Sequence, residues 1–122
     1  MKKINLNEKF GTFSEHWTPK IIAETNGQLV KLAKLKGNLV WHSHENEDEL
    51  FFVIKGTLKL EFRNAEPVVL GPGEMCVVPK GVEHHPVAEE ETEIMLIEPA
   101  STKHTGATVT DRTVALEKQE WI

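Results

Sequence analysis

Turn-forming residues recur so often along this chain that they constrain its fold more than any other feature does. From about Ile21 onward, short runs of Val, Ile, Leu and Phe are separated by glycine, proline and asparagine, with little helical spacing between them. Short apolar runs with turns this frequent indicate an all-β sandwich or barrel. The turn signals stand at Asn26-Gly27, Gly37-Asn38, Gly56, Asn64, Gly71-Pro72-Gly73, Pro79, Gly81, Pro86 and Pro99.

Two of the runs have clear strand patterns. In residues 57–62, apolar Leu58, Leu60 and Phe62 alternate with polar residues, which predicts a strand with one buried face. Residues 50–54 are apolar throughout, as expected for a strand between a barrel interior and a second sheet or a partner subunit. Residues 28–36 suit either a strand or a helix face, and we predict a strand because the neighbouring elements are strands.

A chain of 122 residues provides one hydrophobic core, so we expect a single domain in three parts. Phe10, Phe13 and Trp17 are spaced by three and four, which predicts a short N-terminal helical segment over about 5–18. The barrel should occupy about 20–99. The polar residues 100–122 form a C-terminal extension that is either wrapped on the barrel or partly disordered.

Composition excludes several kinds of partner. Hydrophobic residues make up 39% and charged residues 27% of the chain, as in ordinary globular proteins. The net charge of -5 and the lack of a basic stripe argue against nucleic-acid and anionic-membrane partners. No apolar run could span a bilayer, and the N-terminus shows no secretory signal. With a single cysteine, Cys76, which should be a small buried hydrophobe, these features predict a cytoplasmic protein.

His42 and His44 are the first candidate functional histidines in the sequence. Residues two apart on a strand point to the same face, so these two imidazoles can chelate one metal ion. Glu49 is the natural carboxylate ligand, provided that the chain turns across residues 45–48 and corrects the odd spacing. Glu47 would take its place if the register differs.

A fourth ligand is expected from the segment Gly73–His84. The apolar strand 75–78 ends at Pro79, Gly81 makes a tight turn, and His84 starts the return strand. A barrel wall can thus present His84 opposite the first two histidines.

These residues resemble both signature motifs of the cupin superfamily. His42, His44, Glu49 and Gly56 have the spacing of the first motif, and Gly73, Pro79, Gly81 and His84 that of the second. The likeness covers about residues 28–99 and is closest to small cupins called mannose-6-phosphate isomerase-like, a label of sequence rather than of demonstrated activity. Two scaffold positions depart from the family: its first glycine usually stands one position before Gly37, and its usual second-motif asparagine is Ala88 here.

The resemblance implies a double-stranded β-helix, or jelly-roll barrel, in which the three histidines and the glutamate coordinate a metal. Such a ligand set suits one divalent ion of Fe, Mn, Ni, Co, Cu or Zn and does not distinguish them. We expect a metal-dependent enzyme for a small polar metabolite, with isomerase, dioxygenase, decarboxylase or lyase chemistry. The alternative is a non-catalytic cupin that binds or senses a small molecule through its metal. The two-sided apolar strand 50–54 further predicts a homodimer.

Other candidates receive structural interpretations. His85 should point away from His84, and His16 and His104 should be solvated because they lie in the terminal segments. The acidic run 89–91 is expected at a solvated hairpin tip. No residue stands out as a general acid or base.

Overall fold

The frequent turns divide the chain into eight strands and two short helices, and the computed structural model describes all 122 residues. The strands are β1 (Lys20–Thr25), β2 (Gln28–Asn38), β3 (Glu49–Lys55), β4 (Leu58–Phe62), β5 (Val68–Leu70), β6 (Met75–Val78), β7 (His84–Pro99) and β8 (Glu120–Trp121). The helices are α1 (Leu6–Phe10) and the 3-10 helix η1 (Leu116–Lys118). Residues 28–36 lie within β2, so the strand predicted there is confirmed.

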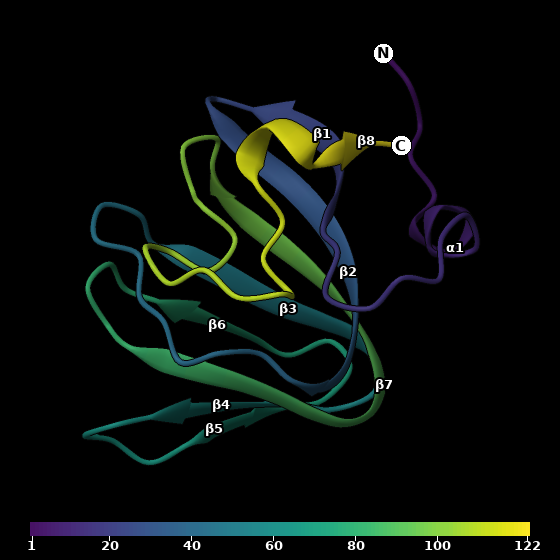
Figure 1. The fold of residues 1–122 in the computed structure, drawn as a ribbon. Coiled ribbons are helices and arrows are strands. Elements are labelled where there is room, and N and C mark those ends of the chain that lie inside the picture. Colours follow the sequence, from purple (N-terminus) through teal and green to yellow (C-terminus); the bar gives the residue numbers. More distant parts are fainter.

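Strand β7 is the longest element and holds the sheet together. Its first residues pair with β4, and its second half pairs with β2 on one side and β3 on the other, all antiparallel. Strand β6 extends the sheet beyond β3, and β5 extends it beyond β4. The sheet curls on itself, so that β4 and β5 lie opposite β1 and β2 across the interior (Figure 1). The predicted all-β fold, a double-stranded β-helix or jelly-roll barrel, is confirmed.

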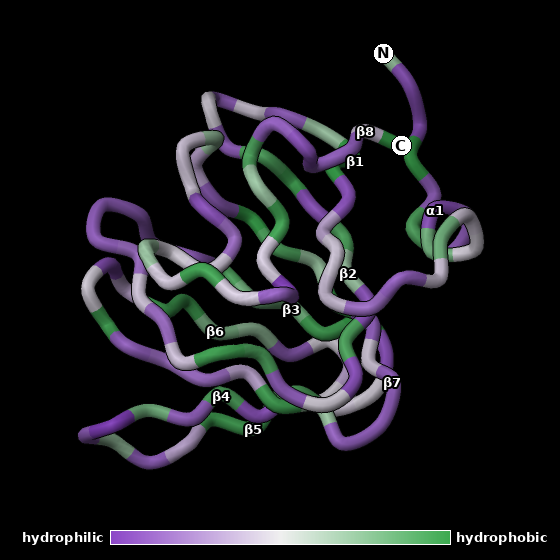
Figure 2. The backbone as a smooth tube through the Cα atoms, viewed as in Figure 1, coloured by the Kyte–Doolittle hydropathy of each residue, from purple (hydrophilic) through white to green (hydrophobic).

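Alternating side chains fill the barrel. Val53, Leu58, Leu60 and Ile94 are fully or almost fully buried in one interior cluster of 13 buried residues. Each such side chain stabilises the fold by about 1.5–3 kcal/mol relative to an exposed one. Figure 2 shows the hydrophobic positions along the strands and the hydrophilic ones concentrated in the connections and the N-terminal residues. The interior cluster therefore supports the walls from which polar site residues project.

The N-terminal helix is shorter than predicted. It spans Leu6–Phe10, and its first turn is capped by Asn5, whose side chain accepts a hydrogen bond from the Glu8 amide. Phe13 and Trp17 are buried as their spacing suggests, but they lie beyond the helix. Trp17 has a positive φ of 56°, incompatible with a continuing helix, and its indole donates a hydrogen bond to the Lys36 carbonyl.

A second correction concerns residues 89–91. They are exposed as predicted, but they lie inside β7 rather than at a hairpin tip. The strand passes through them without a turn residue, and Glu91 pairs with the N-terminal His16 at 3.0 Å. The charge run is therefore a solvated stretch of a continuous strand.

The C-terminal extension wraps on the barrel. Thr102 and Thr105 are fully buried, the Arg112 guanidinium donates to the Asn38 carbonyl, and β8 pairs with β1. Figure 1 shows this segment crossing the open end of the barrel before it reaches η1. No helix in the structure combines the length and hydrophobicity needed to cross a membrane.

Candidate metal centre

His42 and His84 face each other from neighbouring stretches of backbone. The His42 amide donates to the His84 carbonyl at 3.0 Å, and the His84 amide donates to the His42 carbonyl at 2.9 Å. This pair of hydrogen bonds sets the two imidazole centroids 4.4 Å apart. The return strand after the Gly81 turn thus brings His84 into the cluster, directly beside His42 rather than across from the pair as the sequence suggested.

His44 and Glu49 complete the cluster across a turn. The chain bends at Glu45 and Asn46, and β3 then begins at Glu49 with its side chain facing the interior. Glu49 Oε1 lies 3.4 Å from His44 Nε2 and 3.5 Å from His84 Nε2. The bend corrects the odd spacing between His44 and Glu49.

The donor atoms of the four residues are arranged to bind a cation rather than to form hydrogen bonds with one another. One ligand atom from each of His42, His44, Glu49 and His84 lies within 4.8 Å of all the others, and all four residues are buried. His44 Nε2, His84 Nε2 and Glu49 Oε1 are sealed from solvent without a hydrogen-bond partner. Buried polar atoms are rarely left unpaired, so three atoms with lone pairs pointing at one space favour a metal ion there.

Backbone carbonyls orient two of the rings. His42 Nδ1 lies 2.8 Å from the Val40 carbonyl, and His84 Nδ1 lies 3.0 Å from the Val82 carbonyl. A carbonyl accepts only, so each Nδ1 carries the proton and each Nε2 presents its lone pair to the cluster. This tautomer is the one required for metal coordination through Nε2.

The electrostatics of the cluster also favour a cation. Burial, followed by the neighbouring His84, lowers the pKa of His42 to about 4, so its ring is neutral at physiological pH. Burial alone would raise the pKa of Glu49, but its contacts with His44, His84 and Glu98 hold that pKa well below its ordinary value. A neutral His42 imidazole and an ionised Glu49 carboxylate are protonation states in which these groups bind metal ions.

Behind Glu49 lies a second buried carboxyl, that of Glu98. Burial, and then the charge of Glu49, raises the pKa of Glu98 well above its ordinary value, although Lys31 Nζ lies 2.8 Å away. Lys31 is itself completely buried. The interior therefore carries a row of polar side chains from Lys31 through Glu98 to Glu49.

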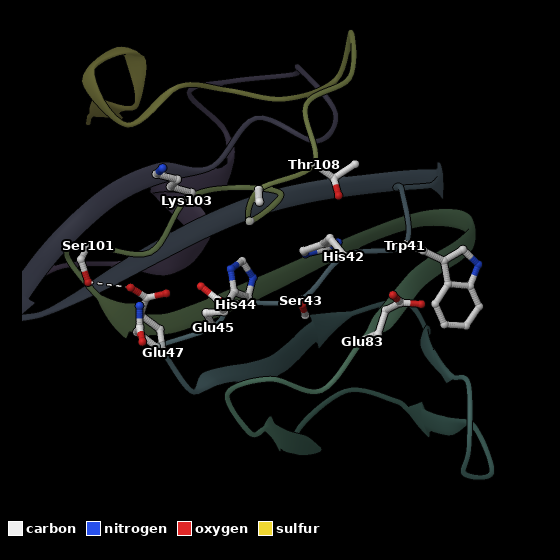
Figure 3. Close-up of a pocket in the computed structure, with 13 residues that line it drawn as sticks. Trp41, His42, Ser43, His44, Glu45, Glu47, Glu83, Ser101, Lys103 and Thr108 are labelled. Carbon is white, nitrogen blue, oxygen red and sulfur yellow. Dashed lines mark hydrogen bonds between the residues drawn. The ribbon is translucent and has the colours of Figure 1, made fainter.

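Two cavities adjoin the cluster, and His42 lines both. The outer one, of about 320 Å³, is a polar mouth between residues 41–47 and the C-terminal extension. Figure 3 shows His42 and His44 on its floor and Lys103 and Thr108 on the opposite side. The inner one, of about 30 Å³, is mainly apolar and is also lined by Glu49 and His104.

The remaining candidates lie elsewhere. His85 points away from the cluster and contacts Glu61 at 2.7 Å, while His16 is at the surface against Glu91. Glu47 lies at the mouth, where it accepts a hydrogen bond from Ser101, so it does not replace Glu49 in the cluster. Cys76 is half-buried against the interior cluster rather than fully buried.

His104 is the residue that the sequence analysis misjudged. It was expected in solvent, but it is half-buried against the inner cavity, and this desolvation lowers its pKa to about 4. Its position depends on the return of the C-terminal extension across the barrel, and no local spacing signals that return. A histidine inside an otherwise polar segment was the only available hint.

An antiparallel β-barrel with three histidines and one glutamate clustered in its interior defines a class of small barrel proteins with a site suited to a metal ion. The particular family follows from its sequence model. The cupin domain model matches residues 29–98, more than half of the chain, and the protein belongs to this family.

Similar proteins come from several bacteria. A cupin-2 domain containing protein from Shewanella frigidimarina is 52% identical, with a TM-score of 0.77 over 79% of this chain and 93% of that one. Protein NMB1881 from Neisseria meningitidis is 35% identical, with a TM-score of 0.74 over 80% of this chain and 99% of that one. Protein YdbB of Bacillus subtilis is 37% identical over 65% of this chain, and the match spans 64% of YdbB.

Proposed function

We propose that this protein is a metal-dependent enzyme for a small polar metabolite, with His42, His44, Glu49 and His84 holding one divalent transition metal ion. The observation that carries the proposal is the set of sealed, unpaired nitrogen and oxygen atoms that converge on one space inside the barrel. If these side chains had only a structural role, their buried polar atoms would have no partner. Each such atom would then lower the stability of the folded state by roughly 1–3 kcal/mol. Fe, Mn, Ni, Co, Cu and Zn all suit three imidazoles and a carboxylate.

Different residues of the chain would have different roles at this site. The four buried residues would bind the metal, and the Val40 and Val82 carbonyls keep two of the rings in the binding tautomer. The polar mouth, with Ser101, Lys103 and Thr108 on its wall, suits the hydroxyl or carbonyl groups of a polar metabolite. When bound, the metal would polarise a carbonyl, enol or carboxylate oxygen of that molecule.

The reaction class stays open among isomerase, dioxygenase, decarboxylase and lyase chemistry, because a fold alone does not choose a reaction. The mannose-6-phosphate isomerase-like label stays a prediction in the same way. A non-catalytic sensor would use the same metal and mouth, so it is separated from an enzyme by turnover rather than by binding.

Turnover after metal reconstitution tests the proposal. The protein is stripped with a chelator, reloaded with each candidate ion in turn, and offered sugars, phenols and keto acids. The proposal expects metal-dependent turnover of at least one of these classes, absent from the stripped protein. Metal-dependent binding without turnover would favour the sensor, and activity that persists without metal would refute the metal-dependent reaction.

We also propose that two copies associate through the outer face of β3 and β6. Cross-strand pairing places Leu50 beside Val77 and Phe52 beside Met75 on this face. Met75 is 53% and Val77 48% exposed, while the side chains of β3 on this face are half-buried. An apolar sheet face beside the edge strand β6 is suited to a second copy. Light scattering should report a dimer that Val77→Lys converts to a monomer, and a monomeric native protein would contradict the proposal.

A further inference from the structure

One histidine outside the predicted ligand set lines a cavity next to the metal site. His104 lines the inner cavity together with His42 and Glu49. It does not belong to the cluster of donor atoms that lie within 4.8 Å of one another, so it is positioned beside the site rather than in it. The rest of this cavity is mainly apolar, with Leu35, Phe51 and other side chains of the interior.

The tautomer of His104 is fixed by a backbone amide. The Val114 N–H donates a hydrogen bond to His104 Nδ1 at 2.9 Å. A nitrogen that accepts from an N–H carries no proton of its own, so in the neutral ring the proton is on Nε2. This is the reverse of His42 and His84, whose Nδ1 atoms donate. The structure gives Nε2 of His104 no protein partner, which leaves its N–H free for a ligand.

The segment that carries His104 is fixed in place. Thr105 is fully buried, and its hydroxyl contacts the Thr113 hydroxyl at 2.7 Å. Gly106 has a positive φ of 59° and packs so closely on the Ser43 backbone that an added Cβ would overlap the Ser43 carbonyl oxygen. The extension thus rests directly on the segment that carries His42 and His44, which holds His104 in a fixed position.

We propose that His104 is a ligand-binding residue of this site, and that it donates a hydrogen bond from Nε2 to a small oxygen anion held in the inner cavity beside the metal. The inference rests on the proposed function, since the same anion would be bound to the metal. His42 and Glu49, the other two titratable side chains of the cavity, are already assigned to the metal. His104 is therefore the titratable side chain left to recognise the ligand there.

The cavity also limits the ligand. A volume of about 30 Å³ admits only a small group, such as one carboxylate, enolate or phenolate oxygen. The larger polar part of such a molecule would lie in the mouth. In an apolar cavity a hydrogen bond to a charged oxygen is stronger than in water, so one donor makes a measurable difference to binding.

Two variants separate the two nitrogens of the ring. In His104→Asn the amide oxygen stands near the position of Nδ1, so it can still accept from the Val114 N–H, but the Nε2 donor is lost. In His104→Gln the amide nitrogen stands near the position of Nε2 and can still donate. Each variant and the native protein are loaded with Co(II), whose visible absorption reports its coordination, and titrated with formate as the smallest carboxylate probe.

The native protein loaded with Co(II) should bind formate. His104→Asn should bind it roughly 10- to 100-fold more weakly, with unchanged Co(II) affinity. His104→Gln should stay within a few-fold of the native affinity. Equal formate binding by the native and His104→Asn proteins would overturn the proposal, as would a native Co(II) protein that binds no formate or a loss of Co(II) itself in His104→Asn. Native protein that takes up no Co(II) would instead refute the proposed function, and this inference with it.

Discussion

Acid should destabilise the metal-free protein through His42 and His104, and the size of the effect follows from their burial. Both rings stay neutral in the folded state because burial lowers each pKa from 6.5 to about 4. The unfolded chain binds a proton at each ring below about pH 6.5, whereas the folded chain does so only near pH 4. Stability is therefore full above pH 6.5 and falls as the pH drops toward 4, by about 3 kcal/mol for each ring.

Urea unfolding of the metal-free protein at several pH values between 4 and 7 measures this loss. His104→Asn removes one of the two protons that the unfolded chain binds and the folded chain does not. The slope of the unfolding free energy against pH should therefore fall by up to about 1.4 kcal/mol per pH unit. All other titrating groups stay in both proteins and cancel in the comparison. Thr108→Val, in the same segment but without a titrating group, serves as the control and should keep the native slope. Parallel curves for the native and His104→Asn proteins would refute the burial of a neutral ring at this position.

Two further predictions concern the barrel and its carboxylate. Gly73→Ala should cost about 1 kcal/mol in urea unfolding from its positive φ alone, because an added Cβ meets nothing within 4 Å. Gly56→Ala should cost about 2 kcal/mol more, since its Cβ would lie 2.5 Å from Thr92 Oγ1 and 2.9 Å from Thr92 Cα, and equal losses would contradict the close approach. Glu49→Gln should weaken metal affinity at least about tenfold in chelator competition, because a neutral amide replaces the charged ligand, and unchanged affinity would exclude Glu49 from the site.

Local rules were sufficient for most of the candidate site. His42 and His44 both point into the site, as residues two apart on an extended chain would, although only His42 forms an isolated β-bridge and no regular strand contains them. A polar, Asn-containing stretch supplies the bend that turns Glu49 inward. The Gly81 turn returns the chain at His84. Each of these relations spans only a few residues, so the spacing alone was enough to predict them.

The predictions from sequence failed where contacts between distant parts of the chain determine the structure. Phe13 and Trp17 have helical spacing, but Trp17 is fixed by a hydrogen bond to Lys36 in a distant strand, and the helix ends before both of them. His104 is partly buried because residues farther along the extension, including Val114, pack over the barrel and hold its ring in the inner cavity. Neither contact has a local signature, so periodicity could not predict either one.

The pair of adjacent histidines at the start of β7 offers the most direct test of the metal centre. His84 faces the cluster, while its neighbour His85 faces outward against Glu61. Elemental analysis of the protein saturated with a transition metal should find one ion per chain in the native protein and in His85→Ala, and a strongly reduced content in His84→Ala. Equal metal content in the two variants, or no bound metal in the native protein, would contradict the account.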